Sequence, residues 1–230
     1  MRNFFITGTD TEVGKTFVAC ALLVALRARG IRVAPMKPVA AGVIVQNGTT
    51  HNEDVHALLA AYGSAIDASL VNPYCFAEPV APHIAAMREA RTIDLEVIEK
   101  YFNQLAASHD GVLVEGAGGF LVPLSMKESM ASLPVRLGLE VILVVGLRLG
   151  CLNHALLTVE AIHARGLILA GWVANTLDSD MTCRQENISS LKQLINAPCL
   201  GVLPRVVGAD VRETSQLACA HLHVDALLKP

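Results

Sequence analysis

The chain has 230 residues, of which 53% are hydrophobic and 17% charged, and its formal net charge is −3. This length fits one domain over residues 1–230, and the apolar excess is typical of a parallel sheet covered by helices on both faces. A slightly negative charge without a Lys/Arg-rich run argues against a nucleic-acid-binding surface. Apolar runs such as 141–147 are too short to cross a bilayer, and the strand pattern near the N-terminus leaves no room for a signal peptide. We therefore expect a cytoplasmic protein that binds neither nucleic acid nor a membrane.

Strand-like and helix-like segments alternate from the N-terminus onward. Strands are expected at 4–6, 31–36, 112–114, 140–145, 167–174 and 199–203. Helices are expected at 17–29, 51–62, 95–108, 153–165 and 182–195, the third with Thr92 or Asp94 as its N-cap. This alternation predicts an α/β fold, namely a doubly wound, mostly parallel sheet with helices on both faces and right-handed crossovers.

The segment from Ile6 to Thr16 has the parts of a phosphate-binding loop between a strand and a helix. Backbone N–H groups at the helix start can face a polyphosphate, Lys15 can reach its β and γ oxygens, and the Thr16 hydroxyl can bind Mg²⁺. The spacing is irregular, because five residues separate Gly8 from Gly14 where the usual pattern has four. The alternative is an ordinary strand–helix turn with a solvated lysine.

Ligands of such sheets bind beyond the carboxyl ends of the strands. The segments expected there share a high content of glycine and polar residues, and they are 7–16, 37–42, 115–119, 146–153, 175–176 and 204–205. This composition suits a cleft that handles phosphate.

Two acidic side chains join Thr16 as candidate Mg²⁺ ligands. Glu115 follows a buried strand and Asp54 lies at the start of a helix. Mg²⁺ prefers hard oxygen donors, so these three side chains with phosphate oxygens would suffice. The alternatives are that Glu115 pairs with a lysine, Lys37 or Lys15, and that Asp54 only complements the helix macrodipole.

Lys37 directly follows a strand and is fixed by Pro38, so we expect its side chain to enter the same cleft as Lys15. Two converging lysines would balance the charge of a nucleotide and of a second anion. The alternative is a solvated lysine at a strand end.

The six cysteines are scattered without a C-x-x-C pair, and the histidine spacings match no familiar zinc site. We expect reduced, mostly buried thiols, without a metal or redox role.

Six segments of the chain resemble the dethiobiotin synthetase family and occur in that family's order. They are GTDTEVGKT (8–16), KPVAAG (37–42), NPYCFAEP (72–79), VEGAGG (114–119), LGCLNHA (149–155) and GWVAN (171–175). The first is suggestive alone, and together with the fourth and fifth it becomes highly specific. The resemblance extends over about residues 1–205.

The resemblance implies a P-loop NTPase-like fold and an ATP- and Mg²⁺-dependent cyclo-ligase of biotin biosynthesis, normally a homodimer. Such enzymes carboxylate diaminopelargonate with CO₂ or bicarbonate, phosphorylate the carbamate with ATP and close a cyclic urea. The products are dethiobiotin, ADP and phosphate.

The resemblance also implies roles for individual residues. Lys15 and Lys37, with Thr11, are the implied catalytic residues. The nucleotide is assigned to Glu12, Val13, Gly14, Lys15, Thr16, Phe17, Asn175, Thr176, Pro204 and Arg205, with Asn175 and the Pro204 loop near the adenine. Glu12 also faces the reacting end of the substrate. The substrate is assigned to Thr11, Lys37, Ala41, Gly118, Gly150, Cys151 and Asn153, with its carboxylate received by 150–153 of the opposite subunit. Mg²⁺ is assigned to Thr16, Asp54 and Glu115.

Several of these positions have other readings. Cys151 could be a reactive thiol, although we favour a small residue in an anion-binding helix start, and Asn153 could be an N-cap. Ala41 stands where the family often has a serine, so one substrate hydrogen bond, worth about 0.5–1.5 kcal/mol, is in doubt. Phe120 stands where tryptophan is frequent, and Arg205 is poorly fixed.

Three rival functions share the fold. Partition and cell-division ATPases carry a signature lysine five positions before the P-loop lysine, where this chain has Asp10. A catalytically silent regulatory domain would not need Lys15, Thr16, Lys37 and Glu115. A cobyrinate-type amidotransferase would need a further glutaminase domain, for which the chain has no room.

Overall fold

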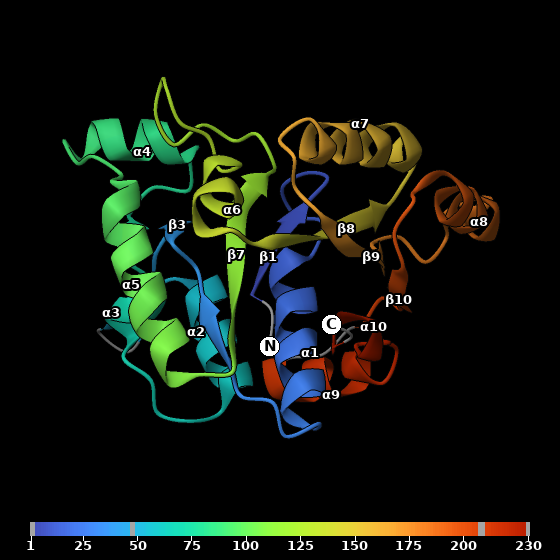
Figure 1. Cartoon of the computed structure of the whole chain (residues 1–230), viewed down its shortest axis with the longest axis horizontal. Coiled ribbons are helices and arrows are strands. Elements are labelled where there is room, and N and C mark those ends of the chain that lie inside the picture. Colours follow the sequence, from blue (N-terminus) through green and yellow to red (C-terminus); the bar gives the residue numbers. More distant parts are fainter. Residues whose placement is uncertain (1–2, 47–48, 207–209, 229–230) are drawn as a thin grey trace.

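The fold is built on a central six-stranded sheet in which every neighbouring pair of strands is parallel (Figure 1). The computed structural model describes residues 3–46, 49–206 and 210–228. The strand order is β10-β9-β8-β1-β7-β2. The strands are β1 (Phe4–Gly8), β2 (Val33–Met36), β7 (Gly111–Gly119), β8 (Glu140–Leu147), β9 (Leu169–Thr176) and β10 (Cys199–Leu203). The predicted doubly wound, parallel fold is thereby confirmed.

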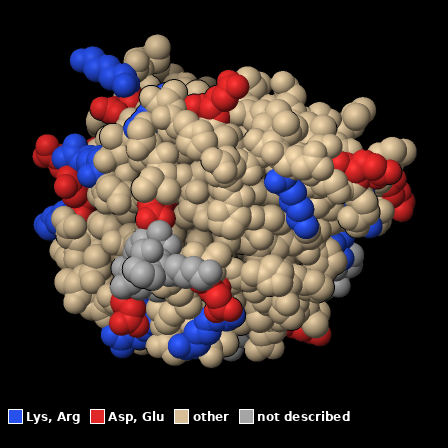
Figure 2. All heavy atoms as spheres, turned by 45° about the vertical axis from the view of Figure 1, so that its right-hand side comes forward, with Lys and Arg blue, Asp and Glu red and all other residues tan. Residues whose placement is uncertain are grey.

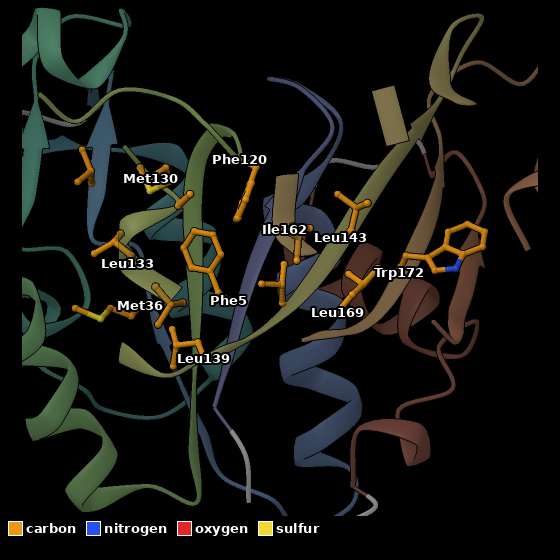
Figure 3. Close-up of a cluster of buried hydrophobic side chains, with 14 of the residues drawn as sticks. Phe5, Met36, Phe120, Met130, Leu133, Leu139, Leu143, Ile162, Leu169 and Trp172 are labelled. Atoms are coloured by element: carbon orange, nitrogen blue, oxygen red, sulfur yellow. The ribbon is translucent and has the colours of Figure 1, made fainter. Parts of the chain in front are cut away.

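The central strands are buried on both faces, which explains their nearly unbroken apolar sequences. All of β1 is buried, as is β8 after its first residue. Successive side chains point to opposite faces, so Phe5 joins one hydrophobic cluster while Phe4 and Ile6 join the other. Figure 3 shows the first cluster, in which Phe5 lies among side chains from neighbouring strands and helices.

Helices cover both faces of the sheet. One cluster joins the strands to helices α1 (Lys15–Arg27), α2 (Glu53–Tyr62), α9 (Val211–Cys219) and α10 (Asp225–Leu228). The other joins them to α4 (Pro82–Arg88), α5 (Leu95–Ser108), α6 (Ser132–Leu137), α7 (Cys151–His163) and α8 (Arg184–Leu194). Asp94 is the N-cap of α5 and its carboxylate accepts a hydrogen bond from Glu96 N at 2.8 Å, so one of the two predicted caps is confirmed.

Several short elements escaped sequence analysis. They are helix α3 (Ala68–Val71), the parallel pair β3 (Val39–Ala41) and β6 (Tyr74–Phe76), and the antiparallel pair β4 (Ile44–Gln46) and β5 (Thr49–His51). Helices α4, α6, α9 and α10 were missed as well. Each has ten residues or fewer, which is too short for a clear periodic pattern.

The predicted end of β7 and the predicted start of α7 are wrong in ways that concern the site. Strand β7 continues to Gly119 instead of ending at 114, because Gly119 still pairs with Gly8 of β1. Helix α7 begins at Cys151 with Gly150 as its N-cap, so the alternative that Asn153 caps this helix is wrong. Gly150 has φ of 92°, a left-handed conformation that glycine adopts at little cost.

Charged side chains are sparse and mixed in sign on the face drawn in Figure 2, where lysines and arginines stand apart from one another between acidic residues. Among the described residues, no helix is long and apolar enough to span a membrane.

The contact between β10 and the C-terminal segment yields a test of the packing. A Cβ atom at Gly201 would lie 2.2 Å from the carbonyl oxygen of His221, a backbone atom that cannot move away alone. We expect Gly201→Ala to lower the free energy of unfolding by about 1–3 kcal/mol in urea titrations. Leu194→Ala, at an exposed position of α8, is the control and should change it by about 0.5 kcal/mol or less. An unchanged urea midpoint for Gly201→Ala would contradict the packing.

Candidate active site

The loop between β1 and α1 is folded back on itself at two glycines. A Cβ at Gly8 would lie 2.5 Å from Cγ2 of Val13, and a Cβ at Gly14 would lie 2.2 Å from Nδ2 of Asn175. Gly14 is also the N-cap of α1, with φ of 86°. The N–H of Thr9 pairs with the carbonyl of Val144 at 3.0 Å, so the loop turns only after this residue. The five-residue spacing between Gly8 and Gly14 therefore has a structural reason, since the position where the backbone closely approaches the Val13 side chain is Gly8.

Lys15 curls over this loop. Its ammonium donates a hydrogen bond to the carbonyl oxygen of Asp10 at 3.0 Å, and the residue is buried. Burial, helped by the charge of Lys37 and opposed by Glu115, lowers the pKa of Lys15 to about 8. The alternative of a solvated lysine in an ordinary turn is thereby excluded, because the ammonium is held inside the loop.

Lys37 lies at the centre of a charged cluster with two carboxylates. Its ammonium is 2.5 Å from Oε1 of Glu115 and 2.8 Å from Oδ2 of Asp54. Burial works to lower the pKa of Lys37, but the two carboxylates outweigh it and raise the pKa above its ordinary value. Lys37 is 3% exposed, so the alternative of a solvated lysine at the strand end is wrong.

Thr16 brings its hydroxyl to the same two carboxylates. Oγ1 lies 2.9 Å from Oδ1 of Asp54 and 2.7 Å from Oε1 of Glu115. One hydroxyl proton serves only one of these contacts, so the other places two oxygen atoms together without a hydrogen between them. Oε2 of Glu115 is buried and has no hydrogen-bond partner among the described residues. Oxygens crowded in this way suit a hard cation, and the residues present therefore fit Mg²⁺.

The two interpretations of Glu115 now stand together. It pairs with Lys37, as the alternative held, and it also offers an unpartnered oxygen beside Thr16. Within the described part of the chain, no three His, Cys, Asp or Glu side chains form a metal-binding group, so a metal here would take further ligands from Thr16, phosphate and water. Its assignment to Thr16, Asp54 and Glu115 stays a prediction.

These groups line a cleft of about 640 Å³. The predicted site residues that line it are Thr11, Glu12, Gly14, Lys15, Thr16, Lys37, Ala41, Asp54, Glu115 and Gly118. The cleft also has an apolar wall. Val39, Ala40 and Ala117 of this wall belong to the segments 37–42 and 115–119 that sequence analysis expected here, whereas Pro79, Val80, Ala81, Pro82 and Val122 were missed. Four of the missed residues, 79–82, end or directly follow the NPYCFAEP segment, whose prolines indicated an irregular chain but not its place in the cleft.

The remaining predicted residues do not line this cleft. Val13 lies within the loop, and Phe17 is in the first turn of α1. Asn175 and Thr176 end β9, where the Asn175 amide donates a hydrogen bond to the carbonyl of Val13 at 2.9 Å. Pro204 and Arg205 directly follow β10. The structure thus joins Asn175 to the phosphate loop, and the assignment of these positions to a nucleotide stays a prediction.

Gly150, Cys151 and Asn153 lie at the N-terminus of α7, outside the cleft of this chain. Cys151 is buried, with Sγ 3.9 Å from Oδ1 of Asn187, whereas Asn153 is exposed. Burial of the thiol favours the interpretation of Cys151 as a small packing residue over a reactive nucleophile. The connection to the phosphate loop runs through Arg148, which forms an ion pair with Asp10.

The two departures from the family pattern have different surroundings. Ala41 ends β3, is half-buried and lines the cleft without a polar side-chain atom. Phe120 is buried, and the guanidinium of Arg165 lies 5.7 Å from its ring centroid. Phe120 thus stands in place of the larger tryptophan that is frequent in the family, and its ring is still buried.

Comparison with known proteins assigns the chain to a family. A family model described as an AAA domain matches residues 2–210. An ATP-dependent dethiobiotin synthetase BioD from Aromatoleum aromaticum is 56% identical over 91% of this chain and 93% of its own length. The chain belongs to the dethiobiotin synthetase family. Another BioD, from Cellvibrio japonicus, is 49% identical over 99% of this chain and 98% of its own length. The resemblance inferred from the six segments is confirmed.

Solved structures with the same fold are much more distant in sequence. The MinC:MinD cell division protein complex of Aquifex aeolicus aligns with a TM-score of 0.54 at 15% identity, covering 94% of this chain and 85% of the other. A ParA family ATPase from Chlorobium tepidum aligns with a TM-score of 0.51 at 15% identity, covering 100% and 95%. These structural similarities confirm that this chain has the P-loop NTPase-like fold.

The lowered pKa of Lys15 predicts how phosphate binding depends on pH. Lys15 loses its proton as the pH rises through about 8, and a neutral amine attracts a polyphosphate less. We expect the dissociation constant of a nucleoside triphosphate, measured calorimetrically without Mg²⁺, to rise roughly tenfold from about pH 7 to about pH 9.5. Lys15→Met is the control, because it reports the titration of every other group. An equal pH dependence in the variant would remove Lys15 as the cause.

Proposed function

We propose that this chain is an ATP-dependent dethiobiotin synthetase, a cyclo-ligase that forms two C–N bonds between diaminopelargonate and one carbon of CO₂. The observation that carries the proposal is the convergence of Lys15, Lys37, Thr16, Asp54 and Glu115 on one cleft in a member of this family. Two ammonium groups beside a phosphate loop suit a reaction in which two anions, a triphosphate and a carbamate, must meet.

The chemical problem is that a carbamate is a poor acyl donor. One amine of the diamine would add to CO₂ and lose a proton to give the carbamate. A carbamate oxygen would then take the γ-phosphoryl group, releasing ADP and leaving a mixed anhydride. The second amine would attack the carbonyl carbon, so that the new C–N bond forms, phosphate leaves with the C–O bonding electrons, and the amine loses its proton. Positioning and charge stabilisation supply most of the catalysis in such reactions.

The lysines have distinct tasks in this proposal. Lys15 is held by the loop carbonyl of Asp10 and is placed to bind β and γ oxygens. Lys37 lines the cleft directly after β2 and would stabilise the carbamate and the phosphoryl group in transfer. Thr16, Asp54 and Glu115 would hold Mg²⁺, which would neutralise charge on the phosphate oxygens when bound.

The rest of the substrates would extend along the residues named from the family resemblance. Thr11, Glu12, Ala41 and Gly118 line the cleft and would face the reacting end of the diamine. Asn175, Thr176, Pro204 and Arg205 would bind the nucleotide, with Asn175 and the Pro204 loop near the adenine. Gly150, Cys151 and Asn153 would receive the substrate carboxylate from the partner subunit of a homodimer, through N–H groups at the start of α7. We place the enzyme in the cytoplasm, in biotin biosynthesis.

Two rival functions fit the site less well. A partition-type ATPase switch would need a cation at position 10, whereas Asp10 is an anion paired with Arg148. A silent regulatory domain has no need of a buried lysine with a lowered pKa, which weakens folding and serves only a ligand.

The substrate requirement of ATP consumption tests the proposal. We expect ADP to form rapidly only when diaminopelargonate and bicarbonate are both present, with one dethiobiotin formed per ADP. A coupled assay for ADP together with chromatographic detection of the product measures both. ATP consumption that is as fast without the diamine would contradict the ligase and favour a switch.

Replacing Lys15 tests its place in the reaction. Lys15→Met should lower kcat/KM for ATP by at least about 100-fold, since it removes a cation from the developing phosphoryl charge. Its urea midpoint should not fall, because burial makes the charged lysine unfavourable in the fold. Lys100→Met, at an exposed position of α5, is the matched control and should retain full activity. Unchanged kinetics in Lys15→Met would remove this residue from the mechanism.

A further inference from the structure

Helices α1 and α2 are tied to each other at both ends. At their N-termini, Thr16 of α1 contacts the carboxylate of Asp54 of α2. At their C-termini, one guanidinium nitrogen of Arg27, the last residue of α1, donates hydrogen bonds to the carbonyls of Ala61 at 2.8 Å and Tyr62 at 2.7 Å. The two helices therefore run in the same direction, with the reaction site at one end and Arg27 at the other.

The contact of Arg27 completes the end of α2. The last carbonyls of a helix have no partner within it and carry partial negative charge, which a cation stabilises. Arg27 satisfies two of them from outside the helix. Gly63 follows with φ of 73°, and a Cβ there would lie 2.6 Å from the same guanidinium nitrogen. The backbone at this end is thus shaped to admit the arginine.

Packing at this end of α2 is interrupted, although Ala61 and Tyr62 are buried and the Tyr62 hydroxyl is hydrogen-bonded to Nε2 of His109 at 2.8 Å. Cavities of about 240 and about 280 Å³ flank the contact, and Arg27 lines both. The guanidinium therefore bridges a gap between the two helix ends. Since Arg27 is exposed, water can replace its hydrogen bonds to the carbonyls, so the fold can survive the loss of the side chain while α2 becomes less firmly placed.

Movement of α2 would reach the site through Asp54. This carboxylate is the only described link from α2 to both Thr16 and Lys37. A helix of ten residues is about 15 Å long and acts as a rigid rod, so a shift at one end displaces the other. The N-terminal end is also held by Asn52, whose Nδ2 donates hydrogen bonds to the carbonyls of Gly42 at 2.7 Å and Ala41 at 3.5 Å.

We propose that Arg27 is a positioning residue that holds Asp54 against Thr16, and thereby sets the affinity of the site for Mg²⁺ with nucleotide. The inference rests on the proposed function in its assignment of Asp54 to Mg²⁺. Arg27 touches neither substrate nor metal, and it acts through the placement of α2.

Calorimetric binding of ATP separates this role from general destabilisation. Arg27→Met keeps the length of the stem and removes the donor. We expect its dissociation constant for ATP to rise roughly tenfold in the presence of Mg²⁺, as for residues that orient metal ligands, and to stay unchanged in EDTA. Arg27→Lys should recover part of the loss, because an ammonium can still bond one carbonyl. Arg29→Met is the matched control. Arg29 lies two residues beyond the end of α1 and bonds Asp225 of α10, so this variant should bind ATP like wild type.

A double-variant cycle identifies Asp54 as the route. In an Asp54→Asn background, Arg27→Met should weaken Mg²⁺-dependent ATP binding by no more than about twofold, because the two changes act on one ligand. The inference would be overturned if the losses in the double variant were additive, or if Arg27→Met weakened ATP binding equally with and without Mg²⁺. It would also be overturned if the wild-type protein bound ATP with the same affinity with and without Mg²⁺. If Arg27→Met fails to fold, Arg27→Gln replaces it under the same criteria. The measurement contains no diamine, so absence of dethiobiotin formation would count against the ligase and not against this result.

Discussion

The buried ion pair between Lys37 and Glu115 is the interaction on which the site depends. Glu115 is fully buried and Lys37 nearly so, and charges taken out of water in this way are stable only with a close partner. The pair follows from strand register. Met36, the last residue of β2, pairs with Val114 of β7, so the residues that follow each of them meet side by side. The sheet itself therefore brings this lysine to this glutamate.

The pair also makes the two lysines of the cleft unlike each other. Removing Lys37 would leave a buried carboxylate alone, which costs about 3–5 kcal/mol, so loss of folding would accompany loss of chemistry. Lys15 bonds only a carbonyl of its own loop, and its removal relieves a buried charge. Before any ligand binds, the two lysines balance Glu115 and Asp54. A cation beside the carboxylates would leave the ammonium of Lys37 available to an anionic substrate.

Sequence alone was sufficient for the parts of the molecule that repeat a strong pattern. The alternation of apolar strands with helices predicted the parallel sheet, and β10 has the predicted bounds. The end of β7 was missed because glycine and alanine disfavour strands, while pairing of Gly119 with Gly8 extends it. The start of α7 was missed because its N-cap, Gly150, adopts a left-handed conformation and has no side chain that would mark a helix start in the sequence.

The site was predictable where chemistry and topology coincide. Lys37 and Glu115 could be placed because polar residues near the carboxyl ends of buried strands meet at one edge of the sheet. The apolar wall at Pro79 and Val122 could not, since nothing in an irregular segment says which surface it covers. Arg27 could not either. A basic residue in the last turn of a helix is common, and only the tertiary fold reveals that its partners are carbonyls of another helix.

Asp10 shows how one position can separate this enzyme from ATPases of the same fold. Its carboxylate accepts a hydrogen bond from the N–H of Thr11 and pairs with Arg148, and these contacts lower its pKa. Its carbonyl oxygen meanwhile holds Lys15. Through Arg148, the same residue joins the phosphate loop to the segment that leads into α7. A lysine at position 10 would face Arg148 and repel it. The Asp10 carboxylate therefore stabilises the loop through contacts within the same chain. It also links the loop to the helix start that is assigned to the substrate carboxylate.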